Sequence, residues 1–210
     1  GLLSQDMPEE ITKEFQVISL IDDYRKRGHL FTQTNPVRDR RDYNPKLNLE
    51  NYNLSSEDLD VVFQAGNEVG LGPTTLTEIL THLQTVYCQS IGIEYVYIRE
   101  LDEFNWIKNF IHKNNNQPNF GKDQKIEILK QLNSCVGFEK FLHKKYVGQK
   151  RFSIEGAESI IPSLEYAISQ GAQLGVNEFI FGMAHRGRLS VLANIFNKPF
   201  ARIFNEFEGV

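Results

Sequence analysis

The fold class depends on one stretch, Glu178-Phe179-Ile180-Phe181-Gly182-Met183, and on the loop that follows it, Ala184-His185-Arg186-Gly187-Arg188. The first six residues form a near-continuous apolar run of the length expected for a buried parallel strand. After the loop, apolar residues between Leu189 and Phe196 recur at helical spacing until Pro199. The sequence therefore predicts a strand, a loop and a helix in that order.

A further helix is predicted before this strand. Apolar positions from Ile160 to Ile168 share one helical face, and Pro162 is tolerated if it falls in the first turn. Helix, strand and helix in this order are the opening of an α/β domain. Because a single strand cannot bury both of its faces, we expect residues 151–210 to be the incomplete start of such a domain. Its partner strands would come from another chain or from polypeptide beyond Val210.

Residues 1–150 are predicted to form a mainly α N-terminal region. Helical periodicity runs from Ile11 to Tyr24, from Leu76 to Tyr87 and from Phe104 to Ile111. The second of these helices is the clearest, because Thr75 and Glu78 have the spacing of a capping box. The first is predicted to end at a left-handed Gly28.

The remaining elements of this region are predicted from weaker patterns. Residues 125–146 indicate two helices that meet near Asn133-Ser134, and the alternating residues 93–98 indicate a short strand. Gly70-Leu71-Gly72 is predicted to be a turn, because it lacks the preceding strand and the third glycine of a phosphate-binding loop. Residues 32–53 are expected to form an extended connection.

Composition and charge exclude several classes of protein. A formal net charge of −4 argues against a broad cationic surface for nucleic acid or anionic lipid. No apolar run approaches the roughly 18 residues of a membrane span, and Gly1–Glu10 do not resemble a secretion signal. The two cysteines, Cys88 and Cys135, are expected to be buried free thiols in a reducing compartment.

The loop at 184–188 is the main candidate for chemistry. His185, Arg186 and Arg188 follow a predicted strand and precede a helix, which is where α/β sheets bind anions. Arginine pairs bidentately with carboxylate or phosphate, histidine can donate to a carboxylate or carry a proton, and Gly187 allows close approach of a ligand. The alternative is a solvated helix start whose arginines bridge to acidic neighbours.

Other polar residues are interpreted as structural. His82, His112 and His143 lie on predicted helices without ligand partners at metal-binding spacing, so no metal site is predicted in these residues. The pairs Lys144-Lys145 and Lys150-Arg151 indicate a solvated basic edge, or else a cationic approach route for an acidic substrate.

Several segments resemble the E1 family of 2-oxoglutarate dehydrogenases, in the same order along the chain. The most specific are 146–158, 182–189 and 191–194, and further matching segments are 24–30, 87–88, 91–95 and 204–209. The resemblance implies oxidative decarboxylation of 2-oxoglutarate on thiamine diphosphate and Mg²⁺ in the tricarboxylic acid cycle. It also implies transfer of the succinyl group to the lipoyl arm of an E2 dihydrolipoyl succinyltransferase.

The same resemblance implies roles for two residues of the loop. His185 would be catalytic and contact the substrate, and Arg186 would lie against thiamine diphosphate and the substrate carboxylate. The full-length subunit would be a homodimer without nucleic-acid or membrane partners. It would be cytoplasmic in a bacterium and located in the mitochondrial matrix in a eukaryote.

Some features of the family have no counterpart in these 210 residues. These are the Gly-Asp-Gly motif with a later Asn that holds Mg²⁺ and the diphosphate, the second substrate histidine and the aromatic N-terminal arm. We therefore expect an N-terminal fragment that is inactive alone and binds neither cofactor tightly. Two alternatives stay open: a related E1 acting on 2-oxoadipate, and a noncatalytic helical module that docks onto other subunits.

Overall fold

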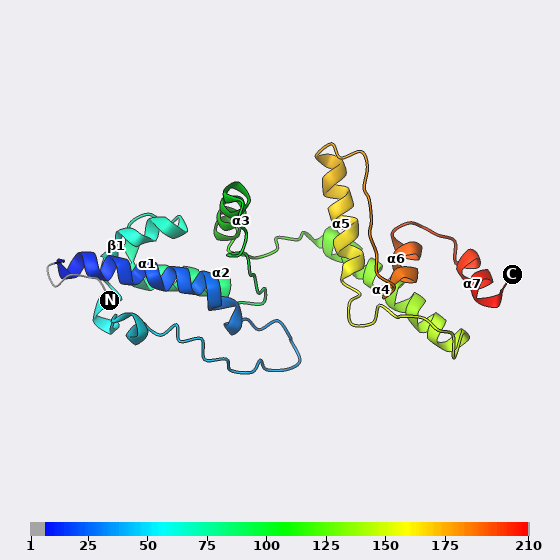
Figure 1. The fold of residues 1–210 in the computed structure, drawn as a ribbon, viewed down its shortest axis with the longest axis horizontal. Coiled ribbons are helices and arrows are strands. Elements are labelled where there is room, and N and C mark those ends of the chain that lie inside the picture. The colour runs from blue at the N-terminus through cyan, green and yellow to red at the C-terminus, as the bar shows by residue number, and fades with distance from the viewer. Residues whose placement is uncertain (1–6, 210) are drawn as a thin grey trace. The chain divides into compact units, whose positions relative to one another are not determined.

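The computed structural model describes residues 7–209 and is mostly helical (Figure 1). It divides into two compact units, of which unit 1 extends to Asn119 and unit 2 begins at Phe120. The mainly helical character predicted for the N-terminal region is confirmed. Within the described residues, no helix is both long enough and apolar enough to cross a membrane.

In unit 1, residues 7–119 form three α-helices, four short 3-10 helices and one small sheet. Its elements are α1 (Glu9–Arg27), η1 (Gly28–Phe31), η2 (Leu49–Tyr52), η3 (Ser56–Asp58), β1 (Val62–Phe63), η4 (Gln64–Val69), β2 (Thr74–Thr75), α2 (Leu76–Tyr87) and α3 (Leu101–Lys113). The two strands pair antiparallel, Val62 with Thr75 and Phe63 with Thr74. Between them Gly70 and Gly72 have positive φ angles, which confirms the predicted turn.

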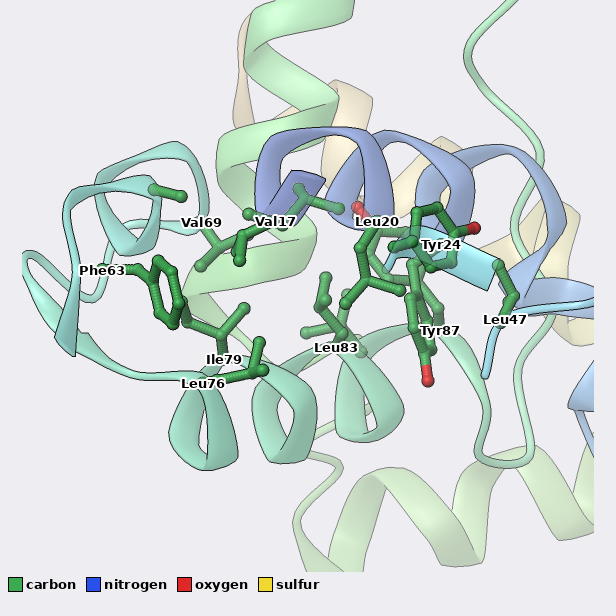
Figure 2. Packing of buried hydrophobic residues seen from close by; sticks show 14 of the residues in the cluster. Val17, Leu20, Tyr24, Leu47, Phe63, Val69, Leu76, Ile79, Leu83 and Tyr87 are labelled. Atoms are coloured by element: carbon green, nitrogen blue, oxygen red, sulfur yellow. The ribbon is translucent and has the colours of Figure 1, made fainter. Parts of the chain in front are cut away.

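The core of unit 1 lies between α1 and α2 (Figure 2). On α2 the buried side chains are Leu76, Ile79, Leu83, Val86 and Tyr87, and Thr75 caps the helix by accepting a hydrogen bond from the Glu78 amide. On α1 the buried face contains Val17, Leu20, Ile21 and Tyr24. Phe63, Val69 and Leu47 belong to the same cluster.

Two details of α1 differ from the prediction. Ile11 and Phe15 lie on the apolar face predicted for this helix, but they are 46% and 50% exposed, because the buried face begins only at Val17. Gly28 ends the helix with a φ of −59°, so it is not left-handed. Glycine is needed there because a Cβ atom would lie 2.6 Å from Cβ of Tyr87.

The strand predicted at residues 93–98 is wrong, since this segment has no regular structure. Its alternation reflects burial of Tyr95, whose ring stacks on Phe104 at a centroid distance of 5.4 Å. The neighbouring Glu94 lies 3.2 Å from Nε2 of His29. Segments 24–30 and 91–95, which both resemble the E1 family, therefore contact each other within unit 1.

Two histidines of unit 1, His82 and His112, belong to a chain of hydrogen bonds. Nε2 of His82 lies 2.9 Å from Nδ1 of His112, and Nε2 of His112 lies 2.9 Å from the Tyr87 hydroxyl. That hydroxyl lies 2.9 Å from the hydroxyl of Tyr95. Burial, together with the nearby His82, Arg25 and Lys108, lowers the pKa of His112 to about 3. The sequence did not predict the chain of hydrogen bonds that joins these two histidines.

Unit 2 consists of α4 (Lys122–Lys145), α5 (Ile160–Gln173), α6 (Arg188–Asn194) and α7 (Phe200–Glu208). The prediction of two helices meeting near Asn133-Ser134 is wrong, because α4 continues through both residues. Asn and Ser disfavour a helix only weakly, and packing of Cys135, Phe138 and Leu142 against the rest of unit 2 decides the local structure. In unit 2, α4 packs against α5 and α6, which lie after residue 150 in the chain. Residue 150 therefore lies within a compact unit and not at its edge.

The strand predicted at 178–183 is also wrong. These residues are extended but have no strand partner, and the only strands that the structure describes are β1 and β2 of unit 1. The apolar side chains are therefore uncovered, with Ile180 92% exposed and Phe179 and Met183 each 38% exposed. The helices that flank the segment, α5 and α6, are present as predicted, with Pro162 in the first turn of α5.

Candidate functional site

The candidate loop is held by a second loop of unit 2. The Gly187 amide donates to the Phe152 carbonyl at 2.9 Å, and Nη1 of Arg186 donates to the Ser153 carbonyl at 3.4 Å. The ring of His185 lies 4.2 Å from that of Phe152 between centroids. The resembling segment 146–158 and the candidate loop at 184–188 are thus joined by main-chain, side-chain and aromatic contacts.

Gly187 makes this contact possible. It is the N-cap of α6 with a φ of +73°, in the left-handed region that favours glycine. A Cβ atom at this position would lie 2.7 Å from Cγ1 of Ile154. Ile154 is itself 3% exposed and belongs to the cluster of Cys135, Ile161 and Val191. The sequence analysis expected a ligand to approach this glycine closely, but in the structure the side chain of Ile154 occupies the space beside it.

His185, Arg186 and Arg188 are all exposed on this loop. Within the described part of the chain, neither arginine forms an ion pair with a carboxylate, so the alternative of arginines that bridge to acidic neighbours has no support there. Two guanidinium groups and an imidazole on one short loop are suited to binding an anion. No group of three or more His, Cys, Asp or Glu residues that could hold a metal occurs among residues 7–209.

Sequence reasoning missed Glu139 and misplaced Arg151. Arg151 was expected on a solvated basic edge, but its side chain is 11% exposed and paired with the carboxylate of Glu139, which is 3% exposed. Lys144, Lys145 and Lys150 are exposed as expected. The available signal was the position of Glu139 on α4, because it lies one turn after buried Cys135 and three residues before buried Leu142.

Segment 204–209, which also resembles the E1 family, contacts residues 146–149, which precede the supporting segment 151–154. Tyr146 packs against Phe204 and Phe207 of α7, at centroid distances of 5.6 and 5.0 Å. Nε2 of Gln149 donates to the Phe207 carbonyl at 2.9 Å. A hollow of about 300 Å³ lies beside these residues, lined by His143, Tyr146, Val147, Gly148, Gln149, Arg151, Ser153 and Glu155.

No protein-family model matches the chain. Among curated proteins, it is 44% identical to the 2-oxoglutarate dehydrogenase E1/E2 component of Corynebacterium glutamicum, over 98% of this chain and 17% of the relative. It is 44% identical to the multifunctional 2-oxoglutarate metabolism enzyme of Mycolicibacterium vanbaalenii, over 97% of this chain and 17% of that protein. The 2-oxoglutarate dehydrogenase E1 component of Brucella anthropi is 38% identical over the whole of this chain and 21% of its own length.

The resemblance found in the sequence motifs is thus confirmed along nearly the whole chain. The chain spans about a fifth of the length of these relatives, all of which come from bacteria. Identities of this size over so complete a stretch, together with the contacts between the motif segments, show that the chain belongs to the 2-oxoglutarate dehydrogenase E1 family.

Proposed function

We propose that this chain is part of an E1 subunit that oxidatively decarboxylates 2-oxoglutarate and passes the succinyl group to the lipoyl arm of an E2 dihydrolipoyl succinyltransferase. One observation carries the proposal for this chain. His185 and Arg186 project from a loop whose backbone is fixed against residues 152–154, in a chain whose relatives are named for 2-oxoglutarate. A fixed loop with exposed cationic donors is preorganised to bind a substrate carboxylate.

The chemistry of the donors fits the cofactor that the family implies. Thiamine diphosphate, when bound with Mg²⁺, would supply carbanion stabilisation for the decarboxylation. The guanidinium of Arg186 offers parallel N–H donors to the diphosphate and to the substrate carboxylate. An imidazole N–H of His185, whose ring is oriented by Phe152, can donate to the substrate. The ligands of Mg²⁺ would come from residues outside this chain.

The surroundings of the loop indicate what the remaining subunit contributes. The extended segment 178–183 exposes Phe179, Ile180 and Met183 immediately before His185. Strands supplied by the rest of the subunit would cover these side chains and would complete an α/β domain beginning near residue 151. We propose, as the family resemblance implies, that the full-length subunit is a homodimer, and that it works in the bacterial cytoplasm because the relatives it matches come from bacteria.

Replacing the two loop residues tests the proposal in the full-length subunit. We expect Arg186→Ala and His185→Ala each to lower kcat/KM for 2-oxoglutarate by roughly tenfold or more, because each removes a charge-assisted or directional hydrogen bond. We also expect Arg186→Ala to weaken thiamine diphosphate binding, which titration calorimetry measures. Arg202→Ala is the matched control, since Arg202 is an exposed arginine on α7.

If both loop variants keep wild-type turnover and cofactor affinity, the active-site assignment is wrong. The helical docking module would then be the better interpretation of this chain.

The substrate is tested by assaying the same subunit with two acids. The names of the relatives favour 2-oxoglutarate, and one additional methylene in 2-oxoadipate is expected to lower kcat/KM by roughly 10- to 200-fold in a pocket fitted to the shorter acid. Steady-state kinetics with both substrates measure the ratio. Equal or faster turnover of 2-oxoadipate would contradict the assignment.

A further inference from the structure

Glu139 of α4 has a buried carboxylate that contacts residues 151–154, the segment that supports the candidate loop. The residue is 2% exposed, and it binds segment 151–154 in three ways. Its Oε2 accepts from Nη1 of Arg151, its Oε1 accepts from the Ile154 amide at 3.4 Å, and its own carbonyl accepts from Nη2 of Arg151 at 3.4 Å. Both ends of this four-residue segment are therefore fastened to one residue of α4.

The middle of the same segment holds the candidate loop. Phe152 supplies the carbonyl that accepts from the Gly187 amide and the ring that contacts His185. Ser153 supplies the carbonyl that accepts from Arg186. Ile154 fills the space beside the Cα atom of Gly187. Every contact described between the two loops thus depends on the position of residues 152–154.

A buried ion pair is a costly way to fasten a loop. The attraction between the two charges in the interior hardly exceeds the cost of removing both from water, so apolar residues of similar volume would hold the core as well. The planar guanidinium of Arg151, however, donates to both the carboxylate and the carbonyl of Glu139, and this pair of directional hydrogen bonds specifies one geometry of the chain in a way that apolar contacts do not. The pair is therefore better suited to fixing a position than to adding stability.

We propose that Glu139 and Arg151 are positioning residues for His185 and Arg186. The ion pair fixes the backbone position of residues 152–154, and the contacts of these residues fix the position and orientation of the candidate loop. The proposal deepens the proposed function and rests on it, because the geometry that is fixed is that of the two proposed site residues.

The first test measures the loop itself in the 210-residue chain. Glu139→Gln keeps the side-chain length and an oxygen that can accept from Ile154, but it removes the charge that Arg151 binds. We expect amide hydrogen exchange, followed by mass spectrometry, to become roughly tenfold faster at residues 185–188. Arg151→Lys, which keeps the charge without the fork, should give a smaller increase. Glu127→Gln, on the exposed face of α4, is the matched control and should leave exchange unchanged.

The second test measures turnover in the full-length subunit. We expect Glu139→Gln to lower kcat for 2-oxoglutarate by roughly five- to tenfold, because a loop that samples several positions presents its donors correctly for less of the time. The KM is expected to change less than kcat, and Arg151→Lys should recover part of the loss. A merely structural role would lower the amount of folded enzyme, which active-site titration corrects, without changing kcat per active site.

Two results would overturn the proposal. Unchanged exchange at 185–188 in a folded Glu139→Gln chain would show that the ion pair does not hold the loop. Faster exchange together with unchanged kcat per site would show that the loop is held but that its geometry does not matter for turnover. In either case the Arg186→Ala variant tells failure of the positioning role from failure of the proposed function. It loses activity if the proposed function is right and only the positioning role is wrong.

Discussion

Gly187→Ala is expected to destabilise unit 2 by about 2–5 kcal/mol. Two costs add at this position. A left-handed backbone, with φ at +73°, costs a residue with a Cβ atom about 1–2 kcal/mol. The new Cβ would also lie 2.7 Å from Cγ1 and 2.9 Å from Cδ1 of Ile154, which is buried and has little room to move. Overpacking of this kind costs roughly 1–3 kcal/mol.

Two other glycines of unit 2 separate the backbone cost from the steric cost. Gly148 has a φ of +84°, and a Cβ there meets no atom within 4 Å, so Gly148→Ala should show the backbone cost alone. Gly182 has no positive φ and also faces open space, so Gly182→Ala should be near neutral. Hydrogen exchange of the α6 amides in the 210-residue chain measures the three variants side by side. Equal stability of the Gly187 and Gly148 variants would contradict the contact with Ile154.

Acid is expected to destabilise unit 1 through His112. Burial lowers the pKa of His112 from its ordinary 6.5 to about 3 in the folded state, whereas the unfolded chain binds a proton near 6.5. Above pH 6.5 both states are neutral at this residue, and stability does not change. As the pH falls from 6.5 towards 3, the unfolded state gains a proton that the folded state lacks, and up to roughly 4 kcal/mol of stability is lost. Below about pH 3 the loss levels off.

Urea unfolding at about pH 7.5 and about pH 4.5 measures this loss. Trp106, the single tryptophan, lies on α3 with His112 and reports on unit 1 by its fluorescence. His112→Gln keeps hydrogen-bonding atoms without a titrating ring. Between the two pH values the variant should therefore lose roughly 2–3 kcal/mol less stability than the wild type loses. His82, whose pKa burial also lowers, retains a smaller contribution of the same sign.

His143→Gln is the control for this experiment, because His143 is exposed on α4 of unit 2. If wild type and His112→Gln lose the same stability between the two pH values, the buried neutral histidine does not explain the acid sensitivity.

The helices could be predicted from the sequence because their determinants are local. In α2 the capping residue Thr75 and the apolar face from Leu76 to Tyr87 lie within one short stretch, and the structure confirms both. The boundary of the buried face on α1 depended on long-range packing instead. Ile11 and Phe15 have the right spacing, yet α2 and η4 leave them uncovered.

The strand at 178–183 could not be predicted correctly because a strand is not a local structure. Its hydrogen bonds need a second strand, and the apolar pattern shows only that the segment is suited to one. The loop at 184–188 was located from its residue types alone, but its support was not. The contacts of Glu139 with Arg151 and Ile154, and of Gly187 with Phe152 and Ile154, join residues that sequence periodicity does not relate.

The two cysteines acquire a practical meaning from the division into two units. Cys88 is in unit 1 and Cys135 in unit 2, both are free, and burial raises the pKa of each thiol, that of Cys88 to about 11. Cys135 is buried, so it reacts with an alkylating reagent only when its surroundings open, whereas Cys88, expected to be buried, is partly exposed and is slowed mainly by its raised pKa. The rate at which the Cys135 sulfur becomes labelled therefore measures how often unit 2 opens locally, and labelling of the partly exposed Cys88 in unit 1 serves as the internal reference.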